Sequence, residues 1–102
     1  MTSSSKKEPR VKRVKKTVKV KNRLGLHARP AAVIAKILQG YSSTVSISYR
    51  DQVVDARSIM NLLMLAIKKN SMIELEAIGE DAKEAIETLM AAFASEFGER
   101  KA

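Results

Sequence analysis

The sequence predicts an α+β fold, an open-faced βαββαβα sandwich in which three helices cover one face of a four-stranded antiparallel sheet. Four segments alternate apolar and polar side chains, as strands do when only one face is buried. Three further segments carry apolar residues at helical spacing. Because each strand is apolar on one side, the sheet needs cover on one face only, and three helices suffice for that.

The first half of the chain predicts a strand, a helix and a second strand behind a basic extension. Residues 1–13 have almost no bulky apolar side chains, so we expect a disordered extension followed by one domain at 14–99. Alternation over 14–21 indicates the first strand and alternation over 44–49 the second. Residues 28–39 form an apolar face at helical spacing and end at Gly40, which favours a helix between those strands.

The second half predicts a hairpin, a short helix, a fourth strand and a last helix. Residues 50–52 turn the chain into a short third strand at 53–56. Ser58 precedes the apolar segment IMNLLMLAI, whose length and Leu/Met content favour a helix. Alternation over 73–77 indicates the fourth strand, and apolar residues from 82 to 97 predict a long final helix. Residues 100–102 are expected to be a C-terminal tail.

Composition excludes several functions. No apolar run approaches 18 residues, so we expect no membrane insertion, and the basic N-terminus lacks the apolar core of a secretory signal. The chain has no cysteine, which excludes disulfides and thiolate chemistry and fits a reducing, cytoplasmic setting. With one histidine and no clustered carboxylates around it, no metal site and no cofactor are expected. Much of the net charge of +8 lies in residues 1–16, which hold seven Lys/Arg and one Glu.

The only histidine, His27, lies in the stretch GLHARPAA. Pro30 suits the first turn of a helix, which puts His27 near the N-cap, and Gly25 lets the chain bend into that helix. The positive end of the helix dipole disfavours imidazolium, so the ring should be neutral and nucleophilic. A tetrahedral dianion bound to that ring would lie against the unpaired N–H groups of the first helical turn. The guanidinium of Arg29 is within reach of the oxygens of this dianion. The pattern predicts a histidine that accepts and passes on a phosphoryl group; a surface or capping histidine is the alternative.

Two motifs resemble the HPr family, the histidine-containing phosphocarriers of the bacterial phosphoenolpyruvate-dependent phosphotransferase system. They are NRLGLHARPA at residues 22–31 and RSIMNLLMLA at 57–66, and the resemblance runs from about Thr17 to Glu99. It implies the βαββαβα fold predicted above. It also implies that His27 is phosphorylated on Nδ1 by phospho-enzyme I and then donates to a histidine of a IIA protein. Arg29 would stabilise the phosphoryl charge and Pro30 would start the helix.

The same resemblance implies a cytoplasmic, monomeric carrier with no turnover of its own. It leaves the sugar-uptake and nitrogen-related regulatory branches open, although the start NRLGLHAR and the ending FASEFGE look more like the nitrogen-related branch. The chain departs from the family pattern in the second motif and after it, at Arg57, Asn61, Ala66 and Asn70. Ala66 stands where a glycine is common and is expected to stiffen the helix, and Asn70 replaces a turn glycine whose left-handed geometry asparagine tolerates.

Ser58 has two interpretations. As the N-cap of the short helix it is explained without regulation. By resemblance it matches the serine that an HPr kinase/phosphorylase modifies in many bacteria, where phosphorylation would add a dianion next to the residues that contact partners.

Apolar residues occupy six of the seven positions of IMNLLML, more than one buried helix face needs. We expect some of them to form an exposed docking patch, and Ile59, Met60 and Leu63 match the family positions that contact partners. Leu62, Leu65 and Ile67 are expected in the core.

Two other functions stay open at this stage. The basic extension suggests a nucleic-acid-binding module, but the strands carry one aromatic residue, Tyr49, and no stacking set, which makes nucleic acid an unlikely partner. The second alternative is a regulatory protein that acts only by docking to partners, with phosphorylation of Ser58 as its switch. The presence of His27, Arg29 and Pro30 argues against this alternative.

Overall fold

The structure, a computed structural model, describes residues 12–99. Its four strands are β1 (Arg13–Lys19), β2 (Thr44–Tyr49), β3 (Gln52–Asp55) and β4 (Met72–Ile78). They form one sheet in the order β1-β4-β2-β3, and all neighbours are antiparallel. The helices are α2 (Ala28–Leu38), α3 (Ile59–Met64) and α4 (Ala82–Ala94), followed by a 3₁₀ turn, η1 (Glu96–Gly98). The predicted βαββαβα order and the antiparallel sheet are confirmed.

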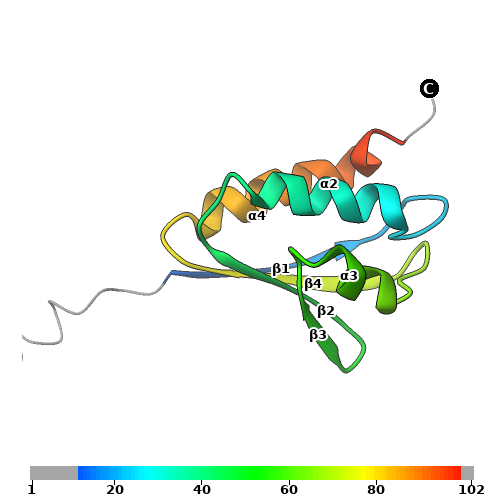
Figure 1. Cartoon of the computed structure of the whole chain (residues 1–102), viewed down its shortest axis with the longest axis horizontal. Coiled ribbons are helices and arrows are strands. Elements are labelled where there is room, and N and C mark those ends of the chain that lie inside the picture. Colours follow the sequence, from blue (N-terminus) through cyan, green and yellow to red (C-terminus); the bar gives the residue numbers. More distant parts are fainter. Residues whose placement is uncertain (1–11, 100–102) are drawn as a thin grey trace, which may run out of the picture.

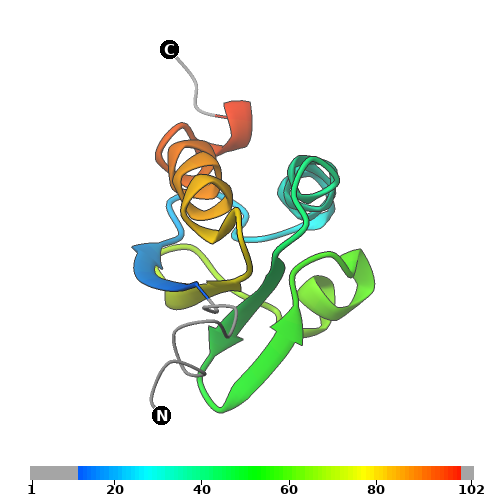
Figure 2. The ribbon, with the colours of Figure 1, turned by 90° about the vertical axis from the view of Figure 1, so that its left-hand side faces the viewer.

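All three helices lie on the same side of the sheet (Figure 2). Helices α2 and α4 run side by side over it, while α3 packs beside α2 and β3. Alternate strand residues bury their side chains under this layer, among them Val45, Ile47 and Leu75, and they meet the apolar faces of α2 and α4. The predicted core residues Leu62, Leu65 and Ile67 are buried as expected.

The opposite face of the sheet carries polar side chains. Lys15 of β1 and Ser46 of β2 both pair with Glu76 of β4, and Arg13 makes an ion pair with Glu76 at 3.2 Å. This arrangement fits the alternation from which the strands were predicted, because a sheet covered on one face leaves the other to polar residues.

The short helix α3 ends earlier than predicted, and this corrects the expectation for Ala66. The helix stops at Met64, Leu65 caps it, and Ala66 lies beyond it with a left-handed φ of 52°. Ala66 therefore does not stiffen the helix. The turn at this position lets the chain bury both Leu65 and Ile67, which a continued helix would not present to the same core. Asn70 has a φ of 72°, the left-handed geometry expected of it.

The last helix also ends earlier than predicted. It stops at Ala94, and Glu96 and Phe97 take left-handed φ values of 55° and 54°. The resulting turn folds Phe97 back onto Phe93, with ring centroids 4.7 Å apart in an edge-to-face arrangement. The two rings therefore pack together although the helix ends between them.

Two charged side chains fasten the end of α2 to its surroundings. Arg57 donates to the backbone carbonyls of Leu38, Tyr41 and Ser43 at 2.7–3.0 Å, at the carboxyl end of the helix where a cation is favourable. Asp81, the N-cap of α4, accepts the backbone N–H groups of Ser42 and Ser43 at 2.8 and 2.9 Å. Hydrogen bonds from the Ser43 hydroxyl and the Ser42 N–H lower the pKa of Asp81 to about 2, so this tie is ionised at neutral pH.

The expected extension and tail fall almost entirely outside the described residues. Within the predicted extension, only Lys12 and Arg13 are described: the Lys12 carbonyl accepts the Gly79 N–H, and Arg13 is the first residue of β1. Residues 1–11 and 100–102 are not described.

Candidate functional site

His27 is the N-cap residue of α2, as predicted. Its backbone is extended, with φ −85° and ψ −169°, and the helix begins at Ala28. Gly25 precedes it with a φ of +69°, and the Leu26 N–H donates to the Ile67 carbonyl at 3.0 Å. Pro30 lies buried in the first turn. The bend at Gly25 and the tie to Ile67 thus hold His27 at the head of the helix.

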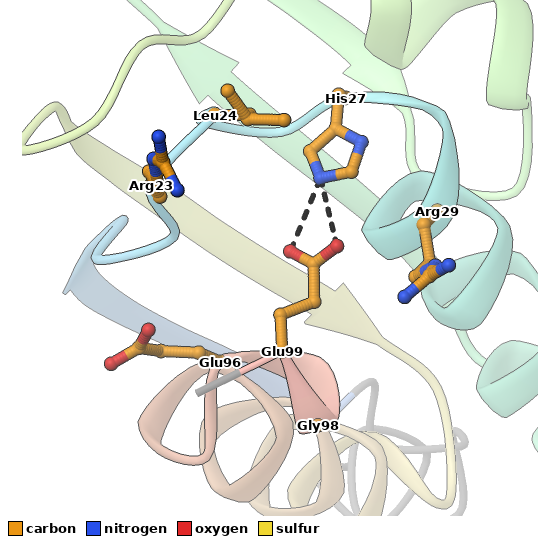
Figure 3. Close-up of a pocket in the computed structure, with 7 residues that line it drawn as sticks. All are labelled: Arg23, Leu24, His27, Arg29, Glu96, Gly98 and Glu99. Carbon is orange, nitrogen blue, oxygen red and sulfur yellow. Dashed lines mark hydrogen bonds and ion pairs between the residues drawn. The ribbon is translucent and has the colours of Figure 1, made fainter. Parts of the chain in front are cut away.

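His27 opens onto a pocket of about 350 Å³ at the end of the molecule where α2 begins and α4 ends. Figure 3 shows its lining, which comes from the loop after β1, the start of α2 and the C-terminal turn: Arg23, Leu24, His27, Arg29, Glu96, Gly98 and Glu99. The two predicted neighbours His27 and Arg29 therefore share one pocket.

Glu99 contacts the ring of His27, and the sequence analysis did not identify it. The Nε2 atom lies 2.9 Å and 3.1 Å from the two carboxylate oxygens (Figure 3). This is one carboxylate and not the cluster of ligands that a metal site would need. No pattern signals this contact, because the two residues are 72 positions apart and meet only through the turn that ends α4.

Asn22 holds Glu99 in this position. Its amide nitrogen donates to Glu99 Oε1 at 2.6 Å and to the Glu96 carbonyl at 2.9 Å, and the side chain is fully buried. Desolvation acts to raise the pKa of the Glu99 carboxyl, but the hydrogen bonds from Asn22 and His27 and the charges of His27 and Arg29 outweigh it. The pKa of Glu99 therefore lies below its ordinary range.

The pocket also offers groups that favour an anion. His27 makes no side-chain hydrogen bond to the helix, so its ring does not cover the first-turn N–H groups of Ala28 and Arg29. Arg29 and Arg23 are exposed and line the same pocket. Helix N–H groups and guanidinium groups both bind phosphate oxygens, so a phosphoryl group on this ring would find partners.

Ser58 and the predicted docking residues lie on α3. Ser58 is its N-cap, and its hydroxyl accepts the Asn61 N–H at 3.1 Å, which confirms the capping interpretation. The predicted patch residues are exposed, at 39% for Ile59, 69% for Met60 and 38% for Leu63. Four more large apolar side chains that were not predicted are exposed as well: Met64 at 74%, Leu24 at 69%, Val53 at 66% and Met72 at 56%. Contact with a partner stays a prediction.

Within residues 12–99, no group of three or more metal-ligating side chains comes together. In the same part of the chain, every helix is too short or too polar to cross a membrane.

Comparison with known proteins gives the class of the molecule. The family model described as "PTS HPr component phosphorylation site" matches residues 14–95. The phosphocarrier protein HPr of Cupriavidus necator is 42% identical over 76% of this chain and 88% of its own length. The phosphocarrier protein NPr of Escherichia coli K12 is 39% identical over 84% of this chain and 97% of its own length. The fold and these similarities define a phosphocarrier protein.

Solved structures of HPr proteins are similar to this chain in fold and sequence. HPr-C-His from Thermoanaerobacter tengcongensis superposes with a TM-score of 0.82 at 35% identity, covering 86% of this chain and 99% of the other. HPr from Bacillus anthracis superposes with a TM-score of 0.75 at 38% identity, covering 79% of this chain and 96% of the other. The chain belongs to the HPr family of phosphocarrier proteins of the phosphotransferase system.

Proposed function

We propose that His27 is the residue that carries the phosphoryl group, accepting it on Nδ1 from phospho-enzyme I and donating it to a histidine of a IIA protein. The observation that supports this most is the position of the ring. His27 lies at the head of α2 with no capping hydrogen bond, and its pocket also contains Arg29. In phosphoryl transfer, positioning and charge stabilisation are most of what a protein supplies, and this pocket offers both.

The protein acts in this proposal as a monomeric, cytoplasmic carrier that catalyses no turnover itself. Relatives named HPr and NPr match at similar identity, 42% and 39%, so both the sugar-uptake and the nitrogen-related branch remain candidates.

Partners dock, in this proposal, on the α3 patch of Ile59, Met60 and Leu63. Helix α3 packs beside α2, so the patch flanks the helix that presents His27. Exposed methionine and leucine side chains adapt to differently shaped partners, as a carrier with several partners requires. Ser58, at the start of the same helix, is the proposed site of regulatory phosphorylation.

Incubation of the purified chain with phosphoenolpyruvate and enzyme I tests the assignment. Intact mass should show one added phosphate that is lost in mild acid and stable in base, and fragmentation should place it on His27. If the chain gains no phosphate from an enzyme I that phosphorylates another carrier, it acts by docking alone, and modification at Ser58 becomes the next measurement.

Replacement of Arg29 by alanine should slow phosphoryl transfer without abolishing it. The change removes a cation that stabilises the transferring group but keeps the nucleophile, and loss of one such stabilising group costs about 100-fold in rate. Rapid-quench measurement of phosphate uptake from phospho-enzyme I gives the rate. The Lys36→Ala variant, which removes a cation further along the same helix, serves as control. Equal rates for both variants would show that Arg29 takes no part in transfer.

Replacement of Ser58 by aspartate should weaken acceptance from enzyme I. A carboxylate at the start of α3 is compatible with the helix, because it lies at the positive end of the helix dipole, but it puts a negative charge beside the docking patch. Titration of the uptake rate against phospho-enzyme I should show a raised KM. Gln39→Glu adds the same charge at the far end of α2 and should leave KM unchanged. The same KM in Ser58→Asp and the wild type would contradict regulation at this site.

A further inference from the structure

The carboxylate of Glu99 constrains which nitrogen of His27 carries a proton. Both of its oxygens lie within 3.1 Å of Nε2, at 2.9 and 3.1 Å. A proton on Nε2 makes this contact a charge-assisted hydrogen bond. Without that proton, the Nε2 lone pair would face two carboxylate oxygens at the same distances, which is repulsive. In the neutral ring, a proton on Nε2 leaves the Nδ1 lone pair free.

The other ring nitrogen points away from Glu99 (Figure 3). His27 makes no side-chain hydrogen bond to the start of α2, so no capping contact occupies Nδ1. The two nitrogens therefore have different surroundings: Nε2 faces a carboxylate, and Nδ1 has no such partner.

Asn22 holds the Glu99 carboxylate in place, so the carboxylate cannot easily turn with the His27 ring or move away from it. The fully buried Asn22 donates both to Glu99 Oε1 and to the Glu96 carbonyl, and thereby joins the loop after β1 to the C-terminal turn. The hydrogen bonds that hold the carboxylate also lower the pKa of Glu99, so it is ionised at neutral pH.

We propose that Glu99 is a positioning residue for phosphoryl transfer: by accepting the Nε2–H of His27, it keeps the ring in the tautomer whose Nδ1 attacks phosphorus. The inference rests on the proposed function of His27. In the step itself, the Nδ1 lone pair forms the new N–P bond. The donor-protein atom that carried the phosphoryl group leaves with the electron pair of the bond that breaks, so the donor ends unphosphorylated. Nε2 keeps its proton throughout. The ring becomes positively charged, and the Glu99 carboxylate compensates that charge.

Nuclear magnetic resonance tests the tautomer directly, because the chain has a single histidine whose ring signals need no assignment. Nitrogen–proton correlations are recorded at rising pH until the ring signals stop changing, and they then give the tautomer of the neutral ring. The full-length wild type should show the Nε2–H form alone, with a slowly exchanging, downfield Nε2 proton. Glu99→Ala should show a mixture of tautomers and lose that proton signal.

Transfer rates give the second readout. Outer partners that orient a histidine typically contribute about 10-fold to 100-fold to activity, so Glu99→Ala should lose about that much in uptake from phospho-enzyme I. Glu99→Gln should recover part of the loss, because its amide oxygen still accepts the Nε2–H. Glu87→Ala is the matched control, because Glu87 is an exposed carboxylate on α4 that does not line the pocket. It should resemble the wild type in both measurements.

The outcomes separate this inference from the proposed function. If Glu99→Ala keeps a single Nε2–H tautomer and matches Glu87→Ala in rate, the positioning role is overturned while phosphorylation of His27 stands. A wild-type ring protonated on Nδ1 overturns it too. If the wild type takes up no phosphate, the proposed function fails instead, whatever the tautomer. Should Glu99→Ala fail to fold, the wild-type spectrum still decides, since a mixture of tautomers in the wild type would also overturn the role.

Discussion

We expect the His27→Ala variant to take up no phosphate from phosphoenolpyruvate and enzyme I, and to stay folded. The change removes the only imidazole in the chain, and no neighbouring side chain in the pocket can replace it as a nitrogen nucleophile. The variant should keep its fold, because His27 is a partly exposed N-cap whose side chain bonds only to Glu99 among the described residues. Loss of one hydrogen bond to a charged group costs about 1.5–3 kcal/mol. Intact mass measures the uptake, and circular dichroism checks the fold.

Ser58→Ala is the control for this experiment. It removes the other candidate phosphorylation site but leaves the pocket of His27 intact, so it should take up phosphate as the wild type does. Acid-labile phosphate on a folded His27→Ala protein would place the acceptor elsewhere and overturn the assignment of His27.

The Gly25→Ala variant should be strongly destabilised. Gly25 has a φ of +69°, and a Cβ built there would lie 2.2 Å from the Ile67 carbonyl oxygen. The left-handed backbone alone costs about 1–2 kcal/mol for alanine, and relief of the clash must move one of the two loops that hold His27. A total loss above about 2 kcal/mol corresponds to a fall in Tm of about 10 °C or more for a domain of this size. Thermal unfolding followed by circular dichroism measures it.

Gly98→Ala separates the two causes. Gly98 has a similar φ of +80°, but a Cβ there meets no atom of residues 12–99 within 4 Å, so this variant should show the backbone cost without the clash. We also expect Gly25→Ala to slow phosphate uptake, because the loop that positions His27 has to shift. If both glycine variants lose the same stability, the close approach to Ile67 contributes nothing.

Local periodicity was enough to predict the fold, because each strand and helix carries its own pattern of buried residues. The ends of elements were less well predicted. Helix α3 stops before Ala66 and α4 before Glu96, although the apolar pattern continues past both points. The backbone turns into a left-handed conformation after both helices, and after α3 this turn lets the later residue Ile67 reach the core. The position at which a helix ends depends on the balance between helix propensity and the burial of later residues. That burial in turn depends on which part of the core the other elements leave unfilled.

The sequence by itself determined the position of His27, because Gly25 and Pro30 act on their immediate neighbours and place the residue at a helix N-cap. It also determined that the apolar residues of α3 exceed what the core can bury, so that Met60 is exposed. Only the tertiary structure decided what faces the ring. Asn22, His27 and Glu99 come from opposite ends of the domain and meet because α4 ends above the loop that follows β1. Hydrogen bonds across 72 and 77 residues follow from packing, which no local pattern encodes.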